Sequence, residues 1–181
     1  MSQQPLLSDA GQRIIDVSAS YLHVVEIGKN ERFNDQEYQT KLAKVGWRPG
    51  YAWCMFDAKL MWLEVYRGTT MYDEVNKVLG GGVVVSYRKA KDSEILKVQQ
   101  KPVIGGIVCW STGNGRGHAG IITHIVDDFT VKTIEGNTSR AGVRDGDKRM
   151  AKHRKLQPKA KHNSDWHYLG TIVPPDYAPL S

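Results

Sequence analysis

The sequence predicts an α+β fold in which a set of helices is followed by an antiparallel sheet. Before about residue 100, apolar residues recur at helical spacing. Beyond Pro102 the pattern changes to short β-rich runs separated by Gly, Asn and Asp. Helices that precede strands in this way are typical of α+β proteins. Because the chain has 181 residues and neither internal repeats nor a low-complexity linker, we expect one domain over residues 1–181.

Five segments of the first half carry helix signals. Ser8 and Asp9 can cap the first segment, and the Asn-Asp-Gln-Glu sequence at residues 34–37 opens the second, which Gly46 ends. The third contains no Gly or Pro and is rich in apolar residues, so it should be a long buried helix. Three glycines at residues 80–82 predict a flexible turn between the fourth and fifth. The expected helices are residues 9–26, 34–45, 52–66, 71–79 and 92–99.

Five runs of the second half are expected to form strands. Asp127 and Asp128 separate the second run from the third so closely that these two should form a β-hairpin. With the turn centred between the two aspartates, the numbers of paired residues sum to about 255. Residue 137 should then lie opposite residue 118, and residue 135 opposite residue 120. The expected strands are residues 107–110, 119–126, 129–134, 150–156 and 168–173.

The net charge of +6 favours an anionic partner. Nucleic acid, a membrane surface and an acidic wall polymer all fit, so the charge alone does not choose between them. No segment approaches the roughly 20 apolar residues that cross a bilayer, so no transmembrane segment is expected. The N-terminus has neither the positive leader nor the apolar core of a secretory signal, and any export is therefore expected to use another route.

The candidate nucleophile is Cys54, which stands at the start of the third expected helix, just after a Pro-Gly turn. The dipole and free N–H groups of a helix N-terminus stabilise a thiolate. The alternative for Cys54 is a buried helix cysteine without a chemical role. Cys109, between Val108 and Trp110 in an expected central strand, is interpreted as an inert core thiol.

The candidate general base is His118, which follows the glycine-rich residues 113–117 and opens an expected strand. A histidine at the mouth of a strand can face a cleft while the strand behind it packs into the core. One of Glu135 and Asn137 is expected to orient its imidazole, because the hairpin register brings both near His118. The alternatives are a polar histidine at a strand end and, for Glu135, a surface charge.

Three blocks of the sequence resemble the signature blocks of the CHAP family, the cysteine, histidine-dependent amidohydrolase/peptidases. They are residues 50–56 (Gly-Tyr-Ala-Trp-Cys-Met-Phe), 117–122 (Gly-His-Ala-Gly-Ile-Ile) and 134–139 (Ile-Glu-Gly-Asn-Thr-Ser). Their order also matches, and the resemblance covers a core of about residues 10–175. The sequence departs from the family at Met55, where members usually have a small residue, so this side chain should either narrow the cleft or pack inward.

The resemblance implies a papain-like fold and hydrolysis of an amide bond in bacterial peptidoglycan through an acyl-enzyme. Cys54 would attack the carbonyl carbon, His118 would transfer the proton, and Glu135 or Asn137 would orient His118. The backbone N–H of Cys54 would serve the oxyanion. The enzyme would be an N-acetylmuramoyl-L-alanine amidase or a peptidoglycan endopeptidase, and it would need no cofactor or metal.

The resemblance also leads to expectations about where the protein acts. We expect a monomer that is made in the cytoplasm without a signal peptide. It would reach the cell wall after release during phage lysis or after delivery by a secretion system.

Other classes of function remain open at the level of the sequence. A CHAP-like acyltransferase would use the same thiol intermediate, and an inactive wall-binding domain would keep only the fold. A nucleic-acid-binding module would use the basic residues 148–155, but aromatic residues do not interleave with them, so no nucleic-acid partner is expected. A zinc amidase could be assembled from Cys109, His118 and His124, which lack a recognisable ligand spacing.

Overall fold

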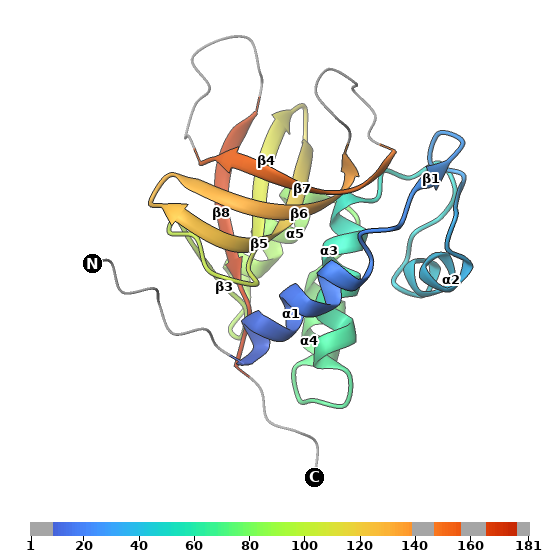
Figure 1. Cartoon of the computed structure of the whole chain (residues 1–181). Coiled ribbons are helices and arrows are strands. Elements are labelled where there is room, and N and C mark those ends of the chain that lie inside the picture. Colours follow the sequence, from blue (N-terminus) through green and yellow to red (C-terminus); the bar gives the residue numbers. More distant parts are fainter. Residues whose placement is uncertain (1–8, 139–146, 157–165, 177–181) are drawn as a thin grey trace.

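The computed structural model describes residues 9–138, 147–156 and 166–176 (Figure 1). Within these residues, five helices pack against a six-stranded antiparallel sheet, which confirms the predicted α+β, papain-like fold. The helices are α1 (Asp9–Ser20), α2 (Gln36–Lys44), α3 (Cys54–Tyr66), α4 (Tyr72–Val78) and α5 (Val83–Asp92). The strands are β1 (Glu26–Ile27), β2 (Arg32–Phe33), β3 (Lys97–Gln99), β4 (Ile107–Gly113), β5 (Arg116–Asp127), β6 (Thr130–Thr138), β7 (Lys148–Lys155) and β8 (His167–Val173).

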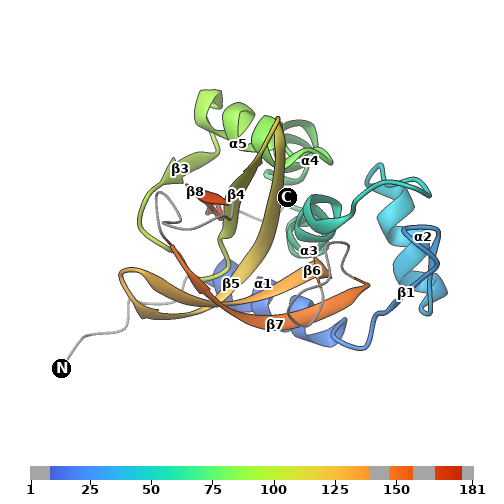
Figure 2. The same ribbon diagram turned by 90° about the horizontal axis from the view of Figure 1, so that it is seen from above.

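The sheet has the order β3-β8-β4-β5-β6-β7, with antiparallel pairing at every step, and β1 pairs separately with β2. In Figure 1, β4, β5 and β8 run steeply through the molecule and β6 and β7 cross them, because the sheet twists and curls. Figure 2, seen from above, shows α3 between the α4–α5 pair and the strands β6 and β7. This central helix therefore meets both halves of the chain.

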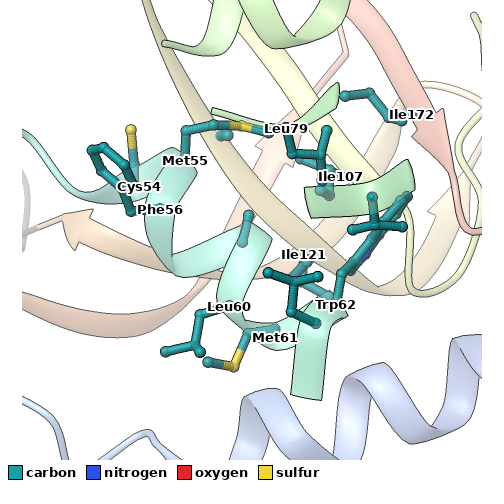
Figure 3. Packing of buried hydrophobic residues seen from close by; sticks show 14 of the residues in the cluster. Cys54, Met55, Phe56, Leu60, Met61, Trp62, Leu79, Ile107, Ile121 and Ile172 are labelled. Atoms are coloured by element: carbon teal, nitrogen blue, oxygen red, sulfur yellow. The ribbon is translucent and has the colours of Figure 1, made fainter. Parts of the chain in front are cut away.

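Helix α3 lies at the centre of the hydrophobic core. All of its residues except Glu64 are buried, and it contacts α1, α2, α4, β5 and β6. Figure 3 shows one of its large side chains, Trp62, beside Ile121 of β5. Because alternate strand residues point to opposite faces of a sheet, Val108 and Trp110 of β4 belong instead to a second, smaller cluster on the other face.

The β5–β6 hairpin forms as predicted, although its turn lies one residue further along the chain. The N–H of Phe129 donates to Asp127 Oδ1 (2.8 Å), so Asp127 opens the turn and pairs with Thr130. Two irregularities in register then shift the pairing along the hairpin. Toward the other end, Ile121 pairs with Ile134, which is the predicted register.

One predicted helix was wrong: residues 92–99 do not form a helix, and β3 lies there instead. The fifth helix comes earlier, directly after the glycine turn, with Gly82 as its N-cap residue. Its first three residues are valines, which favour strands by propensity. Its buried residues, Val83, Ser86 and Ala90, nevertheless follow helical spacing, and this packing decides the structure.

The first helix is shorter than predicted, because it ends at Ser20 instead of near residue 26. The chain that follows pairs with the start of β7: the carbonyl oxygen of Val24 accepts a hydrogen bond from the N–H of Arg149 (3.2 Å). In the part of the chain that the structure describes, no helix combines the length and the apolar character needed to span a membrane.

Candidate active site

Cys54 is the first residue of α3, as predicted, and its side chain is 5% exposed (Figure 3). The N-cap residue, Trp53, makes no side-chain hydrogen bond to the first turn. The backbone N–H groups of that turn therefore have no cap and can serve a ligand. The next residue, Met55, is fully buried, so the bulky side chain that departs from the family pattern packs inward.

Two hydrogen bonds fix the backbone just before Cys54. Gly50 has a φ of 89°, a left-handed conformation that favours glycine, and its N–H donates to the carbonyl oxygen of Asn30 (2.7 Å). The indole Nε1 of Trp53 donates to Glu26 Oε2 (2.7 Å). Both bonds tie the loop to the β1–β2 region, so the position of Cys54 is set by packed structure on both sides.

His118 lies on β5, is 7% exposed, and its Nε2 is 2.8 Å from Glu135 Oε2. Two glycines make this arrangement fit. A Cβ on Gly117 would lie 2.5 Å from the carbonyl oxygen of Trp110, and a Cβ on Gly120 would lie 2.5 Å from Glu135 Cγ. The Gly-His-Ala-Gly sequence therefore leaves room for the histidine and for the carboxylate that it contacts.

Glu135 is fully buried and accepts hydrogen bonds from three other residues. Its Oε2 contacts His118, its Oε1 accepts from Thr133 Oγ1 (2.6 Å) and Arg154 Nε (2.7 Å), and Arg154 Nη2 donates to Oε2. Burial raises the pKa of Glu135, but hydrogen bonds from Arg154 and then from His118 outweigh it and hold that pKa at about 2. The carboxylate is therefore ionised at neutral pH.

His118 carries a proton at neutral pH. Burial lowers its pKa, but a hydrogen bond with Cys54 and another with Glu135 outweigh this effect and raise the pKa to about 9. Because Nε2 faces Glu135, Nδ1 is the ring nitrogen left for Cys54. Cys54 and Glu135 are thus both linked to the His118 imidazole, and all three side chains are buried.

Asn137, the other residue predicted to orient the imidazole, has a different environment. Its backbone is left-handed, with a φ of 52°, and the β5–β6 ladder begins only at the Ile121–Ile134 pair. Residues 118 and 137 are therefore not a ladder pair, contrary to the predicted register. Asn137 Oδ1 is buried without a hydrogen-bond partner among the described residues, whereas Glu135 Oε2 accepts the hydrogen bond from His118 Nε2.

Two tryptophans flank His118. The ring of Trp110 stacks with the imidazole, with centroids 6.1 Å apart and an interplanar angle of 25°, and the ring of Trp166 lies 5.1 Å away at 35°. Both tryptophans also contact the Arg154 guanidinium, whose Cζ is 5.7 Å from the Trp110 centroid and 5.2 Å from the Trp166 centroid.

Sequence reasoning missed these tryptophans and the side-chain partners of Glu135. A sequence signal for Trp110 exists, because antiparallel pairing of β4 with β5 places it directly opposite His118. Thr133 could be found from period-two alternation, which puts it on the same face of β6 as Glu135. We find no local signal for Arg154 or Trp166.

Among the described residues, the remaining cysteine and histidine side chains do not form a second site. Cys109 is fully buried, and burial raises the pKa of its thiol well above its usual range, in accord with an inert core thiol. Both cysteines are free thiols. Over residues 9–138, 147–156 and 166–176, no three His, Cys, Asp or Glu side chains are grouped in a way that could hold a metal ion.

Comparison with known proteins gives one match. A family model described as CHAP domain matches residues 44–137, which is more than half of the chain and includes Cys54, His118, Glu135 and Asn137. No curated protein and no solved structure matches the chain.

Proposed function

We propose that this chain, which belongs to the CHAP domain family, hydrolyses an amide bond of bacterial peptidoglycan with Cys54 as nucleophile and His118 as general acid–base. The family indicates a hydrolase of the amidase or peptidase type that acts on peptidoglycan-like substrates. The assignment of residues is supported by one contact above all: His118 Nε2 lies 2.8 Å from Oε2 of the buried Glu135, and a hydrogen bond with Cys54 also raises the pKa of His118.

In the proposed first step, the Cys54 thiolate attacks the carbonyl carbon of the scissile amide. The carbonyl oxygen becomes an oxyanion, and the N–H of Cys54, which has no partner within the helix, can donate to it. His118 gives its proton to the leaving amine as the C–N bond breaks, which leaves a thioester on Cys54.

In the second step, a water molecule attacks the thioester carbonyl while His118 takes one of its protons. The C–S bond breaks, the product leaves as a carboxylic acid, and the thiolate and imidazolium are restored. Glu135 keeps Nε2 of His118 engaged throughout, which directs Nδ1 toward Cys54. Because Glu135 stays ionised, it also stabilises the imidazolium form that pairs with a thiolate.

The finer description of the substrate is part of the same proposal. The bond is either the glycan-to-alanine amide, cut by an N-acetylmuramoyl-L-alanine amidase, or a peptide bond of the stem or cross-bridge, cut by an endopeptidase. We propose that the protein acts as a monomer on the cell wall, which it reaches after release by phage lysis or delivery by a secretion system.

Digestion of purified peptidoglycan, followed by mass analysis of the fragments, tests this proposal. The wild type should release fragments, Cys54→Ala should release none, and Cys109→Ala serves as a matched control that should retain cleavage. New N-terminal amines would identify a peptidase, and free lactyl ends on the glycan would identify an amidase. Absence of cleavage by the wild type, or equal cleavage by Cys54→Ala, would contradict the proposal.

A further inference from the structure

We infer that Arg154 is a positioning residue of the active site, which holds Glu135 ionised and oriented so that His118 can support the Cys54 thiolate. This inference rests on the proposed function. Arg154 lies on β7, outside the three sequence blocks that carry the cysteine, the histidine and the glutamate.

The contacts between Arg154 and Glu135 use both donors of a guanidinium edge. Nε donates to Oε1 (2.7 Å) and Nη2 donates to Oε2, so the planar fork faces both carboxylate oxygens. The same Oε2 contacts His118. Two parallel hydrogen bonds from the Arg154 guanidinium fix the plane of the Glu135 carboxylate. The orientation of this plane fixes the direction from which Oε2 contacts the His118 imidazole.

The guanidinium is itself held in place by aromatic rings. Its Cζ lies near the faces of Trp110 and Trp166, the two rings that also flank His118. Only 26% of the Arg154 side chain is exposed, and Glu135 is not exposed at all. The ion pair is therefore shielded from water. The same pair would be weak if it were exposed to solvent.

The charges around Glu135 show why Arg154 matters. Burial disfavours the ionised carboxylate, and the charged groups that face it are Arg154 from β7 and His118 from β5. On the side of α3, the nearby cation is Arg149 of β7, which is already paired with Asp57. Without Arg154, the carboxylate would keep only the Thr133 hydroxyl and His118 among the partners described above, and it would take up a proton at a higher pH.

This predicts a change in how fast Cys54 reacts with an alkylating reagent at low pH. An ionised Glu135 favours the imidazolium form of His118, and the imidazolium favours the thiolate. If Glu135 takes up a proton at a higher pH, it no longer supports the imidazolium there, and Cys54 should react more slowly. The acid limb of the pH profile, which is the pH range where the rate of Cys54 alkylation falls as the pH falls, therefore reports on Arg154. This measurement needs no substrate.

The test measures alkylation of Cys54 by iodoacetamide in a Cys109→Ala background, followed by intact mass from about pH 4 to about pH 9. In Arg154→Met, the acid limb should move up by about one pH unit, which is about a tenfold slower reaction at a given pH on that limb. Lys155→Met removes a charge from the exposed end of the same strand and should leave the limb unchanged.

Arg154→Lys keeps the charge but loses the fork, and it provides a second variant if Arg154→Met does not fold. Its limb should lie between those of the wild type and Arg154→Met. The inference is overturned if neither variant moves the limb while thermal stability falls, or if Lys155→Met moves it equally. The proposed function is judged separately, because a wild type that shows this limb but leaves peptidoglycan intact would contradict only the hydrolase proposal.

Discussion

At the scale of single residues, the charge on His118 couples the active site to the stability of the fold. Its pKa is about 9 in the folded protein and 6.5 in its ordinary state. A group whose pKa is raised by folding contributes stability that is complete below its unfolded pKa and is lost as the pH rises through its folded pKa. The free energy of unfolding should therefore fall as the pH rises from 6.5 through about 9.

The variant Cys54→Ala separates this effect from other titrations. The hydrogen bond with Cys54 is the largest of the contributions that raise the pKa of His118, so its removal should make the fall over this pH range smaller. Urea unfolding of both proteins at several pH values measures the difference. An equally steep fall in Cys54→Ala would show that the thiol does not stabilise the imidazolium.

Gly120 offers a test of the space around the carboxylate. A Cβ at this position would lie 2.5 Å from Glu135 Cγ, and Glu135 cannot move freely because three side chains hold it. Gly120→Ala should lower the free energy of unfolding by about 1–3 kcal/mol and reduce peptidoglycan cleavage. Gly80→Ala is the control, since nothing lies within 4 Å of its Cβ. Equal effects of the two variants would argue against a packed carboxylate.

The individual residues of the site differ in how far the sequence predicts them. A helix start and a hairpin register are local features, and they sufficed to predict that Cys54 begins a helix and that Glu135 lies near His118. Their catalytic roles remain predictions. Arg154 was beyond such reasoning, because its ladder partner is Val131 rather than Glu135, and the contact depends on the curl of the sheet and the reach of a long side chain.

At the scale of elements, a buried ion pair joins α3, the helix that begins at Cys54, to the edge of the sheet. Asp57, in the first turn of α3, accepts hydrogen bonds from Arg149 Nε of β7 (2.8 Å) and from the hydroxyl of Tyr38 of α2 (2.7 Å). Arg149 Nη1 also donates to the carbonyl oxygen of Ser18 in α1 (2.6 Å). Three elements thus meet at the Asp57 carboxylate, close to Cys54, and a fourth, α1, is joined to it through Arg149.

Removal of one partner of this pair should be costly. Arg149→Met leaves the Asp57 charge buried, with Tyr38 as its remaining donor, and should cost about 3–5 kcal/mol. The double variant Asp57→Asn with Arg149→Met removes both charges and should cost less than Arg149→Met alone. Chemical unfolding measures both free energies. A double variant that is less stable than Arg149→Met would contradict the idea that an unpaired charge causes the loss.

The helices and strands were predicted correctly where the hydrophobic pattern has a strong period. The prediction failed where the secondary-structure propensity of a segment disagrees with its packing. Segments with clear caps or alternation were found, including the helix of Cys54 and all five strands expected beyond residue 100. Helix α5 was missed because its valine-rich start favours a strand, whereas its burial against β4 and β5 requires a helix. Tertiary contacts decided this segment, and a local pattern does not contain them.

At the scale of the whole molecule, the candidate site forms where the two halves of the chain meet. The helical half supplies Cys54, and the sheet supplies His118, Glu135 and Arg154 from three adjacent strands, β5, β6 and β7. Trp166 arrives from the segment before β8, on the other side of β4 from β5. The curled sheet seen in Figures 1 and 2 is what brings these distant segments together, and strand patterns alone do not predict this curvature.

The net charge of +6 leads to a prediction for the whole protein on its substrate. An anionic wall should attract a basic enzyme, and salt should weaken that attraction, because the Debye length falls from about 10 Å at 0.1 M to about 3 Å at 1 M. Cleavage of intact walls should therefore slow over this range, whereas cleavage of small soluble fragments should change little. Replacing the exposed Lys132 and Lys155 by Glu lowers the net charge from +6 to +2 and should flatten the salt dependence on walls. A rate on intact walls that is the same at both salt concentrations would show that electrostatic attraction does not bring this protein to its substrate.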